Sequence, residues 1–318
     1  MMSIDLEALL PLICNAEIDL VTPLEEAQRE VDSETDPEQR KVLFKKYQPR
    51  WTALRPYMAR LSHGKCWYTE SKNPGFDNDI DHYRPKGSVD VEKGEREHGG
   101  YYWLAFYWRN YRLSCRHSNR FRVHPETEET GGKGDRFPLL DPGRRLRTPT
   151  LRQMDLDDEQ PLLLDPTRSG DEAVISFNAK GLTVISPVFE PNPVEVRRFE
   201  ETKKCYHLDW PDFRSDRVEL YNLILRKVNR GNEIAPPEGA SSLTWPREFD
   251  IIVQELRRLM DPDRPYSRAS RVYLMEHRSR WWVELHVLRI ERLPLLPAPA
   301  PDGAAAPASP STTRTTQG

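Results

Sequence analysis

Residues 78–86 read NDIDHYRPK, a run that sets two carboxylates and an imidazole just before an arginine, a proline and a lysine. Histidine titrates near neutral pH and can accept a proton, and an aspartate beside it can hold a hard cation. Asp81 and His82 are therefore candidates for a metal-assisted hydrolytic site. A polar turn is the alternative interpretation of the same residues.

The composition predicts a soluble globular protein with a local basic region. The chain has 318 residues, of which 37% are apolar, and its 47 basic and 50 acidic residues give a net charge of -3. Residues 82–147 contain 14 basic and 9 acidic residues, so any site for a polyanion must be local. No apolar run reaches the length of a membrane span, and four scattered cysteines do not suit a disulfide scaffold. We expect a cytoplasmic location.

Changes of pattern divide the chain into four parts. Residues 1–61 show helical spacing, and residues 62–140 concentrate aromatics, glycines, prolines and histidines. Residues 141–293 contain two β-prone runs around the turn at 178–181, a predicted hairpin, and then return to helical periodicity that includes the run 268–292. Residues 294–318 are rich in Pro, Ala, Ser and Thr and are expected to be a disordered tail.

Three polar motifs follow one another within the second part. They are Asp81-His82, Asn110 within WRNYRLSC, and Asn119 within CRHSNR. This order resembles the His-Asn-His/Asn pattern of HNH endonucleases. The resemblance implies an α+β fold class, in which a ββα-metal core at residues 62–140 is embedded in a mostly helical chain with a small β-hairpin.

The resemblance also implies a role for each motif residue. Asp81 and Asn119 would be the protein ligands of Mg²⁺ or Mn²⁺, because such ions take carboxylate and amide oxygens. His82 would be the general base, with its ring oriented by Asn110. Asp79 lies on the same face as Asp81 in an extended segment and is the reserve ligand. Neighbours on a regular strand point to opposite faces, so Asp81 and His82 share one site only if the strand bends.

Basic residues near these motifs are predicted to hold nucleic-acid phosphates, while the tyrosines and tryptophans among them could stack on bases or form core. The expected contacts are Arg84, Lys86, Arg112, Arg116 and Arg120. Other interpretations stay open. Asn119 could cap a helix, Asn110 could stabilise a turn, and residues 133–135 could bind phosphate or turn the chain.

Many HNH proteins brace this fold with Zn²⁺ held by two Cys-x-x-Cys pairs. Here Thr69 follows Cys66 and Ser118 follows Cys115 at the second position of each pair. Hydroxyls are poor zinc ligands, so we predict no structural zinc. The alternative is a site made of both cysteines and His117 with a further histidine, namely His63, His98 or His124.

A longer series of motifs narrows the resemblance. DIDHYRPK, YYWLAFYWRNYRLSC, CRHSNR, KGDRFPL and LLLDPT, spread over residues 50–230, resemble the HNH nuclease subunit of Septu-type anti-phage systems and their retron-associated relatives. The resemblance implies a bacterial defence endonuclease that cleaves DNA, or alternatively RNA, together with an ATPase of the SMC/ABC type. A catalytically silent nucleic-acid-binding or adaptor subunit is the alternative from another class. A restriction or mobile-element endonuclease is a third interpretation.

Overall fold

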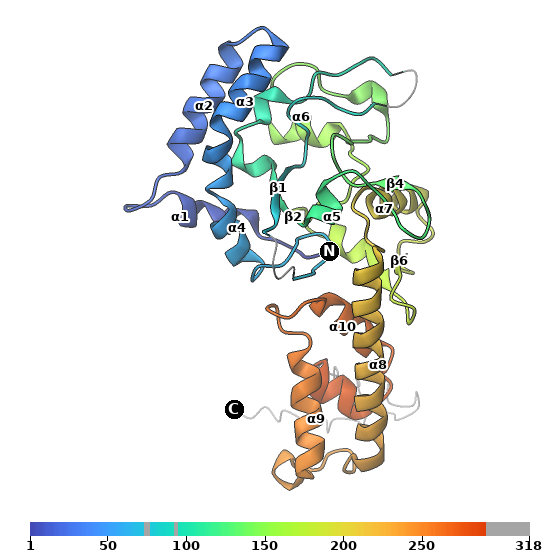
Figure 1. The fold of residues 1–318 in the computed structure, drawn as a ribbon. Helices are drawn as coiled ribbons and strands as arrows, with labels where there is room; N and C mark the ends of the chain where they lie inside the picture. Colours follow the sequence, from blue (N-terminus) through green and yellow to red (C-terminus); the bar gives the residue numbers. More distant parts are fainter. Residues whose placement is uncertain (73–76, 92–94, 291–318) are drawn as a thin grey trace, which may run out of the picture.

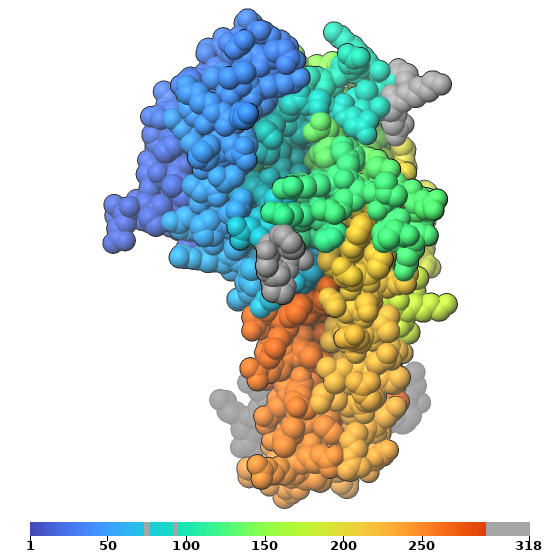
Figure 2. Space-filling view, in the orientation of Figure 1, coloured from blue at the N-terminus to red at the C-terminus, as the bar shows by residue number. Residues whose placement is uncertain are grey.

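The computed structural model describes residues 1–72, 77–91 and 95–290. The tail predicted at residues 294–318 lies outside these ranges. Figure 1 shows a body that contains the N-terminal helices and the short strand pairs, with an arm of C-terminal helices extending from it. Figure 2 shows the arm as a narrower column below the body. Within the described ranges, none of the helices has both the length and the apolar character needed to cross a membrane.

The N-terminal segment is helical, as its periodicity predicts. Its helices are α1 (Leu10–Ile13), α2 (Val21–Ser33), α3 (Pro37–Thr52) and α4 (Arg55–Leu61). α3 begins where it does because the Asp36 side chain accepts a hydrogen bond from the Glu38 amide (2.9 Å) and Pro37 suits the first turn. The apolar faces of α2 and α3 share one core with Phe106 and Tyr111. Packing therefore continues across the predicted boundary at residue 61.

A pair of short strands forms the centre of the body. β1 (Asp79–His82) pairs antiparallel with β2 (Tyr111–Ser114), so that Asp81 lies opposite Arg112 and His82 opposite Tyr111. α5 (Arg116–Asn119) follows β2 and packs on β1. This strand, strand, helix order is the order that the expected ββα unit requires, and the metal-binding class of the unit stays a prediction. A second small pair, β3 (Arg122–Val123) and β4 (Thr130–Gly131), and the helix α6 (Gln153–Asp158) follow.

The predicted hairpin is confirmed. β5 (Ile175–Phe177) pairs antiparallel with β6 (Thr183–Ile185), and the Asn178 side chain accepts hydrogen bonds from the Lys180 and Leu182 amides in the turn. Gly181 has a φ of +71°, and a Cβ there would lie 2.4 Å from the Arg214 carbonyl oxygen. Glycine thus permits both the left-handed turn and its close approach to the helix α8 (Pro211–Ile234), which contains Arg214.

The C-terminal part is helical, with one interruption. It contains α7 (Pro193–Cys205), α8 (Pro211–Ile234), α9 (Arg247–Arg258) and α10 (Ser267–Met275). The periodicity over residues 268–292 does not give one helix, because α10 ends at Met275 and a π-helical turn follows at Val283–Val287. The break buries Trp282, whose indole N–H donates to Asn232 (3.1 Å).

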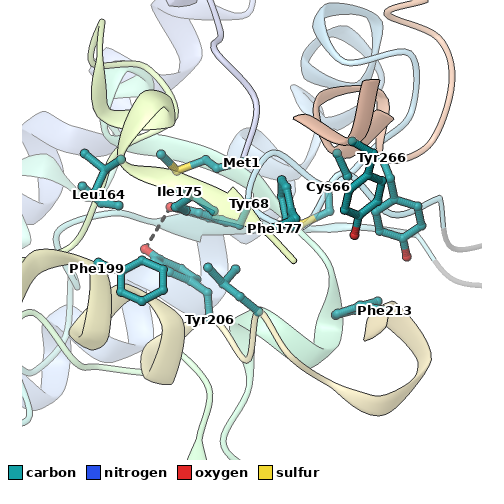
Figure 3. Packing of buried hydrophobic residues seen from close by; sticks show 14 of the residues in the cluster. Met1, Cys66, Tyr68, Leu164, Ile175, Phe177, Phe199, Tyr206, Phe213 and Tyr266 are labelled. Carbon is teal, nitrogen blue, oxygen red and sulfur yellow. Dashed lines mark hydrogen bonds between the residues drawn. The ribbon is translucent and has the colours of Figure 1, made fainter. Parts of the chain in front are cut away.

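Two stacked tyrosines join the body to the C-terminal part. The rings of Tyr68 and Tyr206 lie 3.6 Å apart at an angle of 16°, and the Tyr206 hydroxyl donates to that of Tyr68 (2.9 Å). Figure 3 shows this pair among buried side chains that include Ile175 and Phe199. One continuous core therefore links β5 and α7 to Cys66 and Tyr68, which follow α4.

Candidate active site

Asp81 is buried and already neutralised. Its carboxylate lies 3.3 Å from the Lys133 ammonium and accepts a hydrogen bond from the Tyr68 hydroxyl (3.3 Å). Lys133 is itself fully buried and also donates to the His82 carbonyl oxygen (2.9 Å). Buried charges persist in proteins when they are paired in this way. The predicted metal ligand is thus occupied by an ammonium group.

Asp79 is the carboxylate that meets Asn119. Its Oδ2 accepts hydrogen bonds from the Asn119 amide (3.2 Å) and from the Arg120 guanidinium (3.0 Å). The Asp79 side chain is 18% exposed and that of Arg120 is 56% exposed. The structure brings Asn119 into contact with the reserve ligand Asp79, and the metal-binding roles of Asp81 and Asn119 stay predictions. The reason is that α5 packs beside the start of β1, two residues before Asp81.

His82 points away from both carboxylates. Its ring packs edge-on against Trp51 and Tyr111, with centroids 5.1 and 5.0 Å apart, and its Nε2 lies 2.9 Å from the Ala105 carbonyl oxygen. A carbonyl oxygen only accepts, so Nε2 carries the hydrogen and Nδ1 is the basic atom. Burial lowers the pKa of His82 well below its ordinary value, and nearby Lys86 lowers it further. The imidazole is therefore neutral and enclosed.

Asn110 holds the chain after His82 and does not hold the ring. Its side chain accepts from the Arg84 amide (2.9 Å) and donates to the carbonyl oxygens of Arg84 (3.0 Å) and Leu104 (3.2 Å). The prediction that Asn110 orients His82 is corrected, since Ala105 supplies that contact. Asn110 is a positioning residue that ties the end of β1 to the segment before β2.

Two predicted phosphate contacts are engaged elsewhere. Arg84 donates to Glu159 (2.8 Å), and Arg112 forms a two-point contact with Asp165 (2.6 and 2.5 Å). Both arginines are buried, and a buried guanidinium needs such a carboxylate. These two predictions are wrong for the described conformation. Both carboxylates come from residues far along the chain, which no local pattern reveals.

The other three predicted contacts lie nearer the surface. Arg120 is exposed beside Asp79, Arg116 is half-buried on α5, and Lys86 is half-buried with its ammonium 5.0 Å from the centre of the Trp51 ring. Arg120 borders the carboxylate face of β1 through Asp79, whereas Lys86 is near His82. The basic residues therefore divide between the two sides of the strand.

A divalent cation fits only part of the predicted ligand set. Asp79 and Asn119 are in contact, and turning the Asn119 amide over would put its oxygen where its nitrogen lies. A carboxylate and an amide oxygen are donors that Mg²⁺ accepts while keeping several waters. Asp81 and His82 are engaged with other partners. Across the described ranges, no group of three or more His, Cys, Asp and Glu residues has a metal-holding arrangement.

The remnants of the two Cys-x-x-Cys positions do converge. The Cys115 amide donates to Cys66 Sγ (3.2 Å), and the Cys115 thiol donates to the Ser118 hydroxyl (3.3 Å). Although burial raises the pKa of Cys66, hydrogen bonds from Cys115 and Thr69 bring it below the ordinary thiol value. Two thiols and two hydroxyls are therefore hydrogen-bonded at the positions where the resemblance implies four zinc-binding thiolates. The absence of a structural zinc stays a prediction.

Residues that the sequence did not single out complete the geometry. Trp51 and Ala105 enclose the imidazole, while Tyr68 contacts Asp81. Lys133 belongs to a motif that predicts phosphate binding or a turn, and its contact with Asp81 spans 52 positions. The sequence offers one signal for a buried lysine, which is that KGDRFPL places Lys133 shortly before a run of apolar residues. Pairing over such a distance is a property of the fold.

Comparison with known proteins gives one informative similarity. Over 132 residues the chain is 28% identical to the Septu protein PtuB of Bacillus mycoides (strain KBAB4), and the aligned part covers 41% of this chain and 40% of that protein. The chain therefore spans well under two thirds of this curated relative. No family model and no solved structure matches the chain. Over two fifths of its length, the chain is thus similar to a Septu protein, the same class that its motif order resembles.

Proposed function

We propose that this chain is the nuclease component of an anti-phage defence system and hydrolyses phosphodiester bonds of DNA, with RNA as the alternative substrate. The contact between Asp79 of β1 and Asn119 of α5, in a motif order that resembles HNH endonucleases, carries the proposal. The similarity of part of the chain to a Septu protein supports the defence setting.

The residues would divide the work as follows. Asp79 and Asn119 would hold Mg²⁺ or Mn²⁺, which supplies Lewis-acid stabilisation of charge on the phosphate oxygens. Arg120, exposed beside them, would contact the phosphate. His82, neutral because of its burial, has Nδ1 as its proton acceptor.

Hydrolysis through His82 requires a change at the end of β1. His82 is 6% exposed and its ring packs against Trp51, away from Asp79, so neither water nor the carboxylate face reaches the ring in the described conformation. A bend at this strand end would bring the two sides together. We propose that an ATPase partner of the SMC/ABC type licenses that change, which would keep the nuclease silent without its partner.

Cleavage assays with matched variants test the proposal. Purified chain, with and without the ATPase, is incubated with supercoiled plasmid and with RNA in Mg²⁺ or Mn²⁺. Asp79→Asn and His82→Gln are each expected to lower the cleavage rate by about 100-fold or more. Asp77→Asn, an exposed carboxylate just before β1, is the control and is expected to cleave normally. Normal cleavage by folded His82→Gln protein would remove the chemical basis of the proposal.

A silent adaptor subunit is the second candidate. The observation in its favour is that Lys133 neutralises Asp81 while aromatic rings enclose His82. For an adaptor, neither metal supports cleavage of any nucleic acid, even with the ATPase present, although the chain still binds its partner. Metal-dependent cleavage that Asp79→Asn abolishes excludes this candidate.

A further inference from the structure

A basic cavity of about 300 Å³ lies between α3 and the segment that links β1 to β2. α3 contributes Arg40 and Phe44, and the linking segment contributes Lys86, Arg96 and Tyr102. Arg147 is a fourth cation in the lining, and Glu97 is the one carboxylate among the described lining residues. The cavity therefore carries an excess of positive charge.

Among the residues that the structure describes, these cations have no carboxylate partner, unlike the buried arginines of the strand pair. The Arg40 guanidinium lies 3.8 Å from the centre of the Tyr102 ring, and its Nε makes no hydrogen bond to any residue within the described ranges. In the described part of the chain, neither Arg40, Lys86 nor Arg96 has a carboxylate within 4.0 Å. Cations gathered in one cavity repel each other, and an anion bound between them relieves that repulsion.

Aromatic side chains form the apolar wall of the cavity. Phe44, Tyr102 and Trp103 line it, and the buried indole N–H of Trp103 has no partner within the described ranges. A volume of about 300 Å³ is at the lower end for small-molecule sites, so one nucleotide could enter but a duplex could not. Gly100, with φ of +82°, allows the wall to close, because a Cβ there would lie 2.5 Å from the Lys86 backbone.

We propose that this cavity binds a single unpaired nucleotide, with its phosphate on Lys86, Arg96 and Arg40 and its base on the aromatic wall. The assignment rests on the proposed function, because a nucleic-acid strand is then the source of the nucleotide. Trp51 connects the two sites, since it contacts the His82 ring and also lies beneath the Lys86 ammonium. A strand held here would run beside His82. A free nucleotide has the same chemistry, and the experiment separates the two sources.

Binding is measured in EDTA, so that it does not depend on hydrolysis. The probe is a fluorescein-labelled thymidine octamer, followed by anisotropy over a range of salt concentrations. Arg96→Gln and Lys86→Gln are expected to weaken binding by about 5- to 20-fold and to lower the salt slope by about 0.7 each. Arg258→Gln, which removes an exposed charge on α9, is expected to bind like the unmodified chain. Arg96 is exposed, so its substitution leaves the fold intact.

Competitors identify what the cavity recognises. AMP is expected to displace the octamer at lower concentration than inorganic phosphate, and a blunt duplex to displace it poorly. If AMP binds and the octamer does not, the cavity still recognises a nucleotide, but its ligand is a free nucleotide and not a nucleic-acid strand. Unchanged binding by both cavity variants overturns the proposal, as does equal displacement by phosphate and AMP. The binding assay contains no free divalent cation, so a failure of the nuclease proposal is seen separately, in the cleavage assay.

Discussion

The two faces of β1 differ in what surrounds them, since one is polar and charged and the other is aromatic. On one face, Asp79 contacts Asn119 and Arg120, and Asp81 pairs with Lys133. On the other, His82 is enclosed by the rings of Trp51 and Tyr111 and touches one carbonyl oxygen. Residues adjacent in sequence therefore have unrelated surroundings, because successive side chains of a strand point to opposite sides.

The difference teaches why an Asp-His pair in a sequence is not yet a catalytic pair. Polar groups from later segments compensate the carboxylates, whereas aromatic burial keeps the imidazole neutral. Joint action of the two faces requires a bend at the strand end. Variants that weaken one face alone can establish how independent the faces are.

Lys133→Met is expected to have the largest effect. It leaves the buried Asp81 carboxylate without its cation, which should lower the free energy of unfolding by about 3–5 kcal/mol. The double variant Asp81→Leu/Lys133→Met removes both charges and is expected to recover most of that loss. Urea denaturation of the three proteins measures it. Equal losses in the single and double variants would contradict a buried ion pair.

Asn110→Ala is expected to come next. It leaves the amide and carbonyl of Arg84 and the carbonyl of Leu104 without their side-chain partner, a loss of about 2–4 kcal/mol in unfolding free energy. Asn119→Ala, which removes one contact on the carboxylate face, should lose about 1 kcal/mol or less. Parallel denaturation curves compare them. A larger loss of stability in Asn119→Ala than in Asn110→Ala would show that Asn119 makes the more important tertiary contacts.

The imidazole face predicts a particular pH dependence. The pKa of His82 is depressed in the folded chain, so below about pH 6.5 the unfolded chain binds a proton that the folded chain excludes. Stability is therefore full above the unfolded pKa and falls as pH decreases. His82→Gln should make the fall between pH 6 and 5 shallower by about 1 kcal/mol per pH unit. An unchanged slope in the His82→Gln protein would contradict a buried, neutral imidazole.

Arg120→Gln is expected to have the smallest effect. Its ion pair with Asp79 lies at the surface, so the loss should be below about 1 kcal/mol and should vanish in 1 M salt. Arg112→Gln, which breaks the buried pair with Asp165, should remain destabilising at the same salt concentration. Denaturation at two ionic strengths distinguishes a surface contact from a buried one.

Local sequence patterns predicted local structure well. The helical spacing before residue 61 and the glycine-ended turn at 178–181 both correspond to the structure. The opposite orientation of Asp81 and His82 also followed from strand geometry alone. In these cases the deciding interactions are between near neighbours in the chain.

Partners from distant segments could not be predicted. Arg84 and Arg112 look like phosphate contacts in sequence, yet Glu159 and Asp165 neutralise them across 75 and 53 positions. Which carboxylate Asn119 contacts depends on how α5 packs against β1. A shift of α5 by two residues along β1 would replace Asp79 with Asp81. Charge compensation of this kind is set by the assembled core.

The hydroxyls of Tyr206 and Tyr68 form a relay that ends on Asp81. Tyr206, at the end of α7, donates to Tyr68, which in turn donates to the carboxylate. A displacement of α7 would therefore alter the hydrogen bond that Tyr68 donates to Asp81. The C-terminal helices are thus connected by hydrogen bonds to the buried carboxylate of Asp81. A protein that binds these helices and shifts α7 would change the surroundings of that carboxylate.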